Sequence, residues 1–434
     1  MSGTDDLFTP DFKPAPYWWD RTPRPDLPRA DPPTEADVVI IGSGYTGLHA
    51  ALVTARAGLS TMVVDAEDAG HGCSTRNGGQ ISTSIKPGYA ELSRRYGPDV
   101  ATAIRADGQA SLDFTGEFIR IEGIDCDHRV VGRFHGAHLP KSYDQLSRDC
   151  AVTHPGYTTD AFMVSPQDMP GELGTKAYHG GCVFPHHASV DPARYHAGLL
   201  CVAMEAGATV IPHCAATNLA RGPTGQTVTT ARGRIRAGRV ILATNGYSGP
   251  LSPWHRRRII PIGSYMIATD PIAPELMDSL FPTDRVLSDT RKLVYYYRPS
   301  PDRTRVLFGG RVSVTETDPR MSAPKLHAEL VRLFPELKGT KVSHSWMGFV
   351  GYTFDTLAHI GERDGVHYAM GYCGSGVGMA GYLGMKLGRK AAGLADGETG
   401  LEQAPFPTRP LYSGNPWFLA PAVMAYRMRD RFGV

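Results

Sequence analysis

Three glycines near the start of the chain have a spacing that can do chemistry. Gly42, Gly44 and Gly47 form a G-x-G-x-x-G motif directly after the apolar stretch VVII. In such a motif the first glycine permits a tight turn, the second lets the backbone approach a pyrophosphate, and the third lets a helix pack close to a strand. The diphosphate then lies at a helix N-terminus, where free N–H groups and the helix dipole favour negative charge.

Asp65 ends the second apolar stretch, TMVVD, at the spacing expected for an acceptor of ribose hydroxyls. An acid here would repel a phosphate on the ribose 2′-oxygen, which argues against NADP. A glycine turn also occurs in ordinary α/β proteins, but here strand, turn, helix, second strand and acid follow in the order that a dinucleotide site requires. The motif therefore predicts a dinucleotide, without separating FAD from NAD.

Two further glycine-rich loops bear on that choice. Residues 70–82, GHGCSTRNGGQIS, are small enough to lie flat against a large planar ring. Residues 371–381, GYCGSGVGMAG, open a helix whose N-terminus can stabilise negative charge on a reduced flavin. Packing alone explains one such loop, whereas three in one chain favour FAD over a nicotinamide cofactor. The residues predicted to bind FAD are Gly42, Ser43, Gly44, Tyr45, Thr46, Gly47, Asp65, Ala66, Ser74, Thr75, Arg76, Asn77, Gly78, Gly79, Gln80, Thr244, Asn245, Gly246, Gly374, Ser375, Gly376, Val377 and Met379.

Composition limits the partners. The chain has 434 residues, which predicts two or three lobes, and a net charge of +2, which gives no reason to expect nucleic acid. No apolar run approaches the ~20 residues that span a bilayer. The N-terminus lacks an apolar signal core, and the seven scattered cysteines fit free thiols in a reducing compartment. These features predict a cytoplasmic protein without a membrane span.

Periodicity outlines the elements that must position the glycine loops. Residues 1–35 are rich in proline, which predicts an extended arm without a helix or a central strand, packed on the body through its aromatic PYWWDR. Residues 89–123 predict two helices that meet at Gly97-Pro98, and residues 192–207 predict a helix with Pro192 in its first turn. Three later segments, 259–271, 292–301 and 304–314, read as antiparallel strands.

Together these stretches resemble the D-amino-acid oxidase superfamily of FAD-dependent oxidoreductases, most closely its gamma-glutamylputrescine oxidoreductase and glycine oxidase-like branch. The resemblance covers residues 17–434 and is carried, in family order, by YWWD, VVIIGSGYTGLHAA, STRNGGQ, PIGSYMIATDP, LFGGR, WMGFVGYTFDTLAHIG, YAMGYCGSGVGMAGYLG and NPWFLAPAVMAYRMRDR. It implies an α/β fold with a Rossmann-like FAD-binding domain of the glutathione-reductase type and a second, substrate domain built on a large antiparallel sheet. The flavin ring would lie at the junction of the two domains.

The domain division predicted on this basis is discontinuous. It places a proline-rich arm at residues 1–35, the FAD-binding domain at 36–100, 180–255 and 345–395, the substrate domain at 101–179 and 256–344, and a C-terminal tail that packs on the body at 396–434.

Four departures from the family pattern are informative. Relatives that tether FAD covalently use a histidine where this chain has Asn77, or a cysteine where it has Gly348, which predicts dissociable FAD. Leu307 stands where sarcosine-oxidase-type relatives place a lysine for oxygen activation, which puts fast oxidase activity in doubt. Cys373 stands in the loop near the flavin, where we expect a buried small residue rather than a reactive thiol.

The substrate side of the site rests on fewer residues. Arg311 ends LFGGR and can hold a carboxylate through two hydrogen bonds, with an ion pair within the substrate domain as the alternative. Tyr265, Tyr296, Trp346 and Tyr352 can form an aromatic wall for an amine, with core packing as the alternative for each. No grouping of residues has metal-ligand spacing.

The resemblance and the residues together predict an FAD-dependent enzyme that oxidises the C–N bond of a small amine or amino acid. A hydride passes to the flavin, the resulting imine hydrolyses to a carbonyl compound, and oxygen or another acceptor takes the electrons. The alternatives are an amine dehydrogenase with little oxygen reactivity, a nicotinamide-linked enzyme, and a flavoprotein without catalysis. The sequence does not predict the substrate's identity or the oligomeric state.

Overall fold

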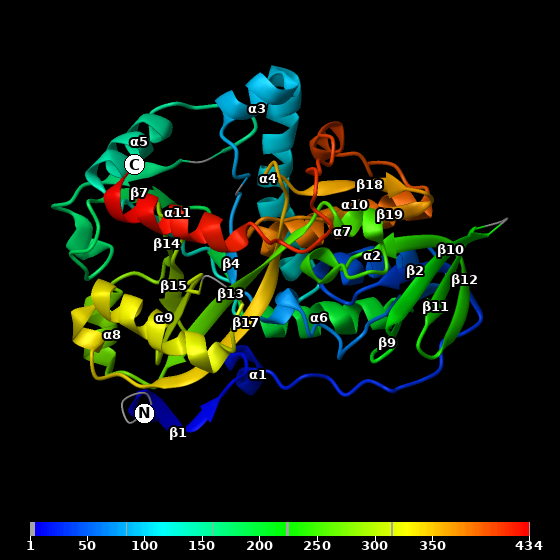
Figure 1. Cartoon of the computed structure of the whole chain (residues 1–434), viewed down its shortest axis with the longest axis horizontal. Helices are drawn as coiled ribbons and strands as arrows, with labels where there is room; N and C mark the ends of the chain where they lie inside the picture. The colour runs from blue at the N-terminus through cyan, green and yellow to red at the C-terminus, as the bar shows by residue number, and fades with distance from the viewer. Residues whose placement is uncertain (1–4, 84, 159, 223–224, 314–315, 434) are drawn as a thin grey trace.

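The computed structural model describes residues 5–83, 85–158, 160–222, 225–313 and 316–433. Two large sheets organise the chain (Figure 1). One carries the βαβ unit predicted from the glycine motif, and the other is mainly antiparallel. This is the predicted α/β fold with a second lobe on a large antiparallel sheet.

The eight-stranded sheet has a parallel centre. Strand β2 lies between β3 and β12, and β3 pairs with β9, all in parallel. Strand β12 also pairs with β19 in parallel and with β11 in antiparallel orientation. The strands are β2 (Glu35–Ile41), β3 (Thr61–Val64), β9 (Thr209–Ile211), β10 (Ala216–Gly222), β11 (Gly225–Thr230), β12 (Gly233–Leu242), β18 (His359–Arg363) and β19 (Val366–Met370).

Helices cover this sheet and meet one another closely. Helix α2 (Tyr45–Arg56) follows β2, and α10 (Gly376–Ala392) follows β19 and packs on α2. A Cβ on Gly388 of α10 would lie 2.7 Å from the Cβ of Val53, so glycine permits this approach. The other helices of this lobe are α3 (Tyr89–Tyr96), α4 (Pro98–Ile121) and α6 (Pro192–Glu205). Gly97, at φ +88°, separates α3 from α4, and Pro192 begins α6, as predicted.

The nine-stranded sheet has the order β1-β17-β13-β16-β15-β14-β5-β7-β6, and all neighbours except β1/β17 and β14/β5 are antiparallel. Its strands are β1 (Phe8–Lys13), β5 (Arg133–Gly136), β6 (Phe162–Val164), β7 (Gly181–Phe184), β13 (Ile260–Thr269), β14 (Val286–Asp289), β15 (Tyr296–Pro299), β16 (Val306–Gly310) and β17 (Val342–Tyr352). Strands β13, β15 and β16 fall within the three segments predicted as antiparallel strands.

The remaining helices, a strand pair and several 3-10 turns connect these parts. They are the helices α1 (Tyr17–Arg21), α5 (Pro140–Cys150), α7 (Pro253–Arg256), α8 (Pro274–Leu280), α9 (Pro319–Leu333) and α11 (Leu419–Phe432), the paired strands β4 (Gln80–Ile81) and β8 (Ala188–Ser189), and 3-10 turns at Asp5–Leu7, Cys73–Thr75, Met169–Gly171, Asn245–Tyr247, Pro335–Leu337 and Gly400–Gln403. Among the described residues, no helix combines the length and apolarity that a bilayer crossing requires.

The N-terminal arm is more regular than its prolines predict. The expectation that it contains no helix is wrong, because Pro16 precedes the one-turn helix α1 and no proline lies inside that helix. Strand β1 is an edge strand on β17, where its Pro10 is tolerated. The arm packs on the body as predicted, with the Trp18 side chain fully buried. Residues 1–4 of the predicted arm lie outside the described residues, as does residue 434 of the predicted tail.

The predicted domain boundaries stay a prediction. Strands β7 and β17 of the nine-stranded sheet begin at residues 181 and 342, beside the boundaries placed at 180 and 345. In Figure 1 the C-terminal helix α11, in red, lies on the left of the view, on the side of the nine-stranded sheet.

Candidate active site

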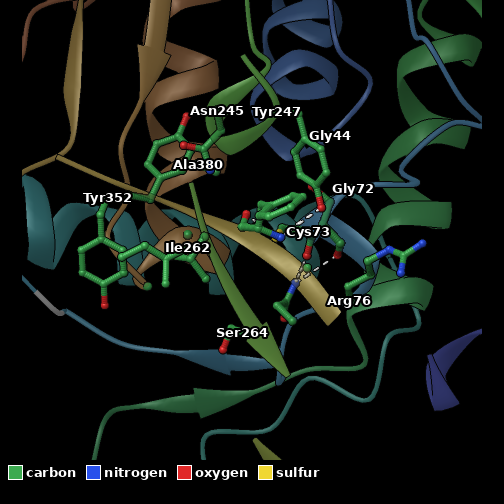
Figure 2. A pocket seen from close by; sticks show the side chains of 18 of the residues that line it. Gly44, Gly72, Cys73, Arg76, Asn245, Tyr247, Ile262, Ser264, Tyr352 and Ala380 are labelled. Atoms are coloured by element: carbon green, nitrogen blue, oxygen red, sulfur yellow. Dashed lines mark hydrogen bonds between the residues drawn. The ribbon is translucent and has the colours of Figure 1, made fainter. Parts of the chain in front are cut away.

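A cavity of about 1070 Å³ is lined by residues from all three glycine loops. It also receives residues of strands β13 and β15 from the other sheet and of helix α11. Figure 2 shows Gly44, Cys73, Asn245 and Tyr352, from four separate segments, around this space. The loops are therefore brought together at one site, between the two sheets.

The first loop follows the geometry that the motif predicts. Gly42 adopts φ +106°, a conformation that glycine takes readily and other residues rarely do. A Cβ on Gly47 would clash with the carbonyl oxygen of Gly42, so the third glycine is required for α2 to pack against the turn. The Asp65 carboxylate accepts hydrogen bonds from the Ser43 amide at 2.8 Å and the Ser43 hydroxyl at 2.6 Å. Asp65 therefore holds the glycine turn in place and also lines the cavity.

Three indole groups hold the second loop. Trp18 Nε1 donates to the carbonyl oxygen of Asn77 at 2.9 Å, and Trp346 Nε1 donates to that of Arg76 at 2.8 Å. Trp19 Nε1 donates to the Thr75 hydroxyl at 2.9 Å. Within the loop, the side-chain nitrogen of Asn77 donates to the carbonyl oxygen of Cys73, at 3.0 Å. These bonds fix the backbone of residues 75–77 beside the cavity.

The third loop leads from β19 into α10 through residues with positive φ. Cys373 has φ +53° and Gly374 has φ +96°, and Ser375 precedes the first residue of α10. The Asn245 side-chain oxygen accepts from the Gly371 amide at 2.9 Å, which ties this loop to the turn after β12. The N-terminus of α10 thereby opens onto the cavity, where its N–H groups favour negative charge.

The Cys373 side chain is buried, as expected. Its sulfur lies 3.4 Å from the Thr353 hydroxyl and 3.1 Å from the carbonyl oxygen of Gly371. Burial raises the pKa of this thiol to about 11, so the reactive thiolate is scarce at neutral pH.

Most residues predicted to bind FAD line the cavity, and six do not. Lining residues are Gly42, Gly44, Tyr45, Thr46, Asp65, Ala66, Ser74, Arg76, Asn77, Gly78, Gln80, Thr244, Asn245, Gly374, Ser375, Gly376 and Val377. Ser43, Gly47, Thr75, Gly79, Gly246 and Met379 are not among the lining residues. Their structural contacts explain their place: Ser43 binds Asp65, for example, and a Cβ on Gly246 would lie 2.9 Å from the carbonyl oxygen of Phe349.

The predicted substrate residues divide in the same way. Tyr296, Tyr352 and Arg311 line the cavity. Tyr265 and Trp346 depart from the expected aromatic wall: both side chains are buried, and neither is among the lining residues. Alternation along β13 explains Tyr265, because neighbouring side chains point to opposite faces of the sheet and Ser264 takes the cavity side. Trp346 pairs with Met266 on the cavity face, but Trp18 and the second loop cover it.

Arg311 is already engaged. Its Nη1 lies 2.9 Å from a Glu316 carboxylate oxygen and donates to the carbonyl oxygen of Gly263 at 2.8 Å. Glu316 also accepts from the Tyr265 hydroxyl at 2.8 Å. The ion pair that sequence left as the alternative for Arg311 is thus present in the structure.

The cavity also contains residues that sequence reasoning missed. Glu67 lies close to Asp65 at the end of β3, Cys73 precedes the predicted residues of the second glycine loop, and Tyr247 follows those of the turn after β12. Lys86 and His135 come from segments without a recognisable motif. Their positions depend on which strands become neighbours, which periodicity does not reveal. One feature of the sequence could have identified Glu67, because it lies two residues after Asp65, the acid predicted from the motif.

Burial sets the protonation of several cavity groups. It lowers the pKa of His135 to about 3, with Arg133 and Lys86 adding to the effect, so the imidazole is neutral. Burial raises the pKa of Tyr296, whose hydroxyl lies 2.8 Å from that of Ser264, so the phenol stays protonated. Burial also raises the pKa of the Cys73 thiol to about 11. His135, Tyr296 and Cys73 are therefore uncharged at neutral pH.

This arrangement fits FAD. Acids at the end of β3, a glycine turn at the start of α2, a rigid small-residue loop and a second helix N-terminus follow one another around a single long cavity. Asp65 and Glu67 would hold the ribose, the N-terminus of α2 the pyrophosphate, and the 73–80 loop and α10 the ring. Fold and site together define a flavin-dependent oxidoreductase.

Comparisons with known proteins agree. Residues 37–389 match the family model DAO, FAD dependent oxidoreductase. The chain is 30% identical to the "Probable oxidoreductase OrdL" of Rhizobium meliloti (strain 1021), over 97% of this chain and 99% of that protein. It is 31% identical to the "Gamma-glutamylputrescine oxidoreductase" of Escherichia coli (strain K12), over 92% and 93%. The glycine oxidase of Geobacillus kaustophilus shares the fold, with a TM-score of 0.68 and 18% identity over 87% of this chain and 99% of that one.

This chain belongs to the DAO family of FAD-dependent oxidoreductases. The resemblance seen in its motifs, and FAD as its cofactor, are thereby confirmed.

Proposed function

We propose that this chain oxidises the C–N bond of a small amine or amino acid. A hydride would leave the carbon next to nitrogen, and water would hydrolyse the resulting imine to a carbonyl compound. Bound FAD supplies the acceptor for the two electrons. The observation that carries the proposal is the single cavity in which the three glycine loops face Tyr296 and Tyr352. The relatives named above, one an oxidoreductase of gamma-glutamylputrescine, also support it.

The side chains at the ring end of the cavity would orient and enclose the substrate rather than remove a proton from it. Within the described residues, the acids that line the cavity are Asp65 and Glu67, both at the nucleotide end. His135 is a poor base because its pKa is about 3. The substrate amine would therefore bind neutral or lose its proton to water, and positioning and exclusion of water would lower the barrier.

Tyr296 and Tyr352 would form the wall that positions the amine. The Tyr296 ring lies over the second loop, where a Cβ on Gly78 would be 3.1 Å from it. Residues Phe418, Leu419, Ala422, Val423 and Tyr426 of the C-terminal segment line the same cavity and would exclude bulk water.

Anaerobic reduction of the bound flavin tests this proposal. Purified protein is mixed with a panel of amines and amino acids without oxygen, and bleaching of the flavin absorbance is followed. We expect at least one primary or secondary amine to bleach it and to yield the matching carbonyl compound. If no amine reduces the flavin while dithionite does, the proposal fails.

A dehydrogenase with little oxygen reactivity is the second candidate. Leu307 is fully buried and packs in a cluster with Trp18 and Trp346, so no ammonium group stands at that place. Turnover is measured with oxygen alone and with an added dye acceptor. Peroxide formation at the full dye-linked rate would exclude the dehydrogenase.

We place either activity in the cytoplasm, supported by seven free cysteines.

A further inference from the structure

The basic side chains of the cavity are not equally paired. Arg311 is held by Glu316, and Arg76 donates to the carbonyl oxygens of His71 and Met347. Lys86 and Lys292 differ: within the part of the chain that the structure describes, neither ammonium makes an ion pair or a hydrogen bond. Lys292 lies beside helix α11, where its backbone N–H donates to the Asp430 carboxylate at 2.7 Å. The Lys86 ammonium instead faces the Tyr352 ring, whose centre is 5.7 Å from Nζ. The side chain is exposed, lines the cavity and has no counter-charge there.

Lys86 lies beside the loop that precedes α10. A Cβ on Gly374 would be 3.9 Å from both the Lys86 Nζ and the Tyr352 hydroxyl. On its other side, the charge of Lys86 contributes to the low pKa of His135 on β5. The ammonium is therefore placed between the α10 loop and the nine-stranded sheet, at the ring end of the cavity.

Chain geometry keeps Lys86 at this place. It follows β4, which pairs with β8, and precedes α3, whose first residue is Tyr89. Pro87 is buried and restricts the backbone directly after the lysine. Among the described residues, the acids that line the cavity are Asp65 and Glu67, which follow β3 beside the turn that would bind the nucleotide.

We propose that Lys86 is the residue that binds a carboxylate of the amine substrate, in the role that sequence assigns to Arg311. This inference rests on the proposed function and makes the substrate an amine that carries at least one carboxylate. An ammonium without a counter-charge inside a cavity attracts an anion, whereas a guanidinium already bound to a carboxylate has little to gain from a second one. Tyr352 and the Gly374 backbone set how far the carboxylate lies from the reacting carbon.

The test compares ligand binding in variants of the flavin-loaded protein. Propionate and benzoate are titrated against their uncharged amides, propionamide and benzamide, and the change in flavin absorbance gives the Kd of each. In Lys86→Met we expect carboxylate binding to weaken by about 10- to 100-fold, as loss of a charge-assisted hydrogen bond implies, and amide binding to change less than about twofold. Lys86→Arg should restore most of the carboxylate affinity.

Two controls make the result specific. Lys338→Met removes an exposed lysine that is not among the residues lining the cavity and should leave every Kd unchanged. Arg311→Met tests the rival anchor. If Arg311→Met loses the preference for carboxylates over amides while Lys86→Met keeps it, Arg311 binds the carboxylate and the inference is overturned. Equal binding of carboxylates and amides by the unaltered protein would overturn it as well.

Failure of the inference is distinguishable from failure of the proposed function. Flavin reduction by uncharged amines alone, with no preference for carboxylated ones, would leave the amine oxidation intact and remove the carboxylate from the substrate class. Absence of reduction by any amine would reject the function itself, whatever the ligand titrations give.

Discussion

The N-terminal arm should control how tightly the protein holds FAD. Trp18 is fully buried in a cluster with Ala193, Met266 and Trp346, and its Nε1 donates to the carbonyl oxygen of Asn77 at 2.9 Å. Asn77 is in the loop that lines the cavity. Replacing Trp18 with Phe keeps a large apolar ring but removes the donor, so the carbonyl oxygen of the half-buried Asn77 loses its partner.

The size of the effect follows from that lost bond. Leaving a buried acceptor without its partner costs about 1–3 kcal/mol. If the whole cost falls on the loop conformation that binds FAD, the Kd for FAD rises about 5- to 150-fold, because about 1.4 kcal/mol corresponds to tenfold. Trp18→Ala should cost more, about 3–5 kcal/mol, because it also leaves a cavity in the cluster.

The assay is titration of the apoprotein with FAD, followed by quenching of flavin fluorescence, alongside thermal unfolding of each variant. Trp254→Phe is the matched control: the same change is made at a tryptophan outside the cavity lining, whose ring packs on Arg258. Trp346→Phe should behave like Trp18→Phe, because its Nε1 holds the carbonyl oxygen of Arg76. The reasoning is refuted if Trp18→Phe lowers the melting temperature while the FAD Kd stays within twofold of the unaltered protein.

Further predictions concern the glycine turn, pH and cofactor release. Gly47→Ala should destabilise the fold by about 1–3 kcal/mol in denaturant unfolding and abolish FAD binding, because its Cβ meets the Gly42 carbonyl, whereas Gly339→Ala, with open space around it, should be neutral. Burial lowers the pKa of His49 to about 3, below its unfolded value of about 6.5. Protonation of His49 therefore favours the unfolded chain, and the free energy of unfolding falls as the pH drops below about 6.5. Between pH 7 and pH 5, the free energy of unfolding of His49→Gln should fall by about 2 kcal/mol less than that of the unaltered protein. FAD should be released by acid precipitation, because Asn77 and Gly348 stand where relatives with tethered FAD have a histidine or a cysteine; flavin that stays with the polypeptide on a denaturing gel would contradict this. The rate constant for flavin reduction divided by Kd should rise with pH up to the pKa of the substrate amine, and a pH-independent value would contradict the need for a neutral amine.

The sequence by itself determined the nucleotide end of the site. Turn conformation, helix start and strand end are local, so Gly42, Gly44 and Asp65 could be assigned from their spacing alone. The same holds for the break between α3 and α4 at Gly97-Pro98 and for Pro192 at the start of α6, where backbone restrictions act on neighbouring residues. The family resemblance supported FAD, which the three glycine loops already favoured, and added a substrate domain built on a large antiparallel sheet.

Tertiary structure alone decided the substrate end. Which face of a strand points inward depends on the sheet that forms around it, so Tyr296 could not be told from Tyr265 by residue type. Glu316 neutralises Arg311 from five residues further on, and Lys86 reaches the cavity from a segment without a motif. Charge pairing and cavity walls arise from contacts between distant parts of the chain, and for that reason local pattern predicts the cofactor better than the substrate.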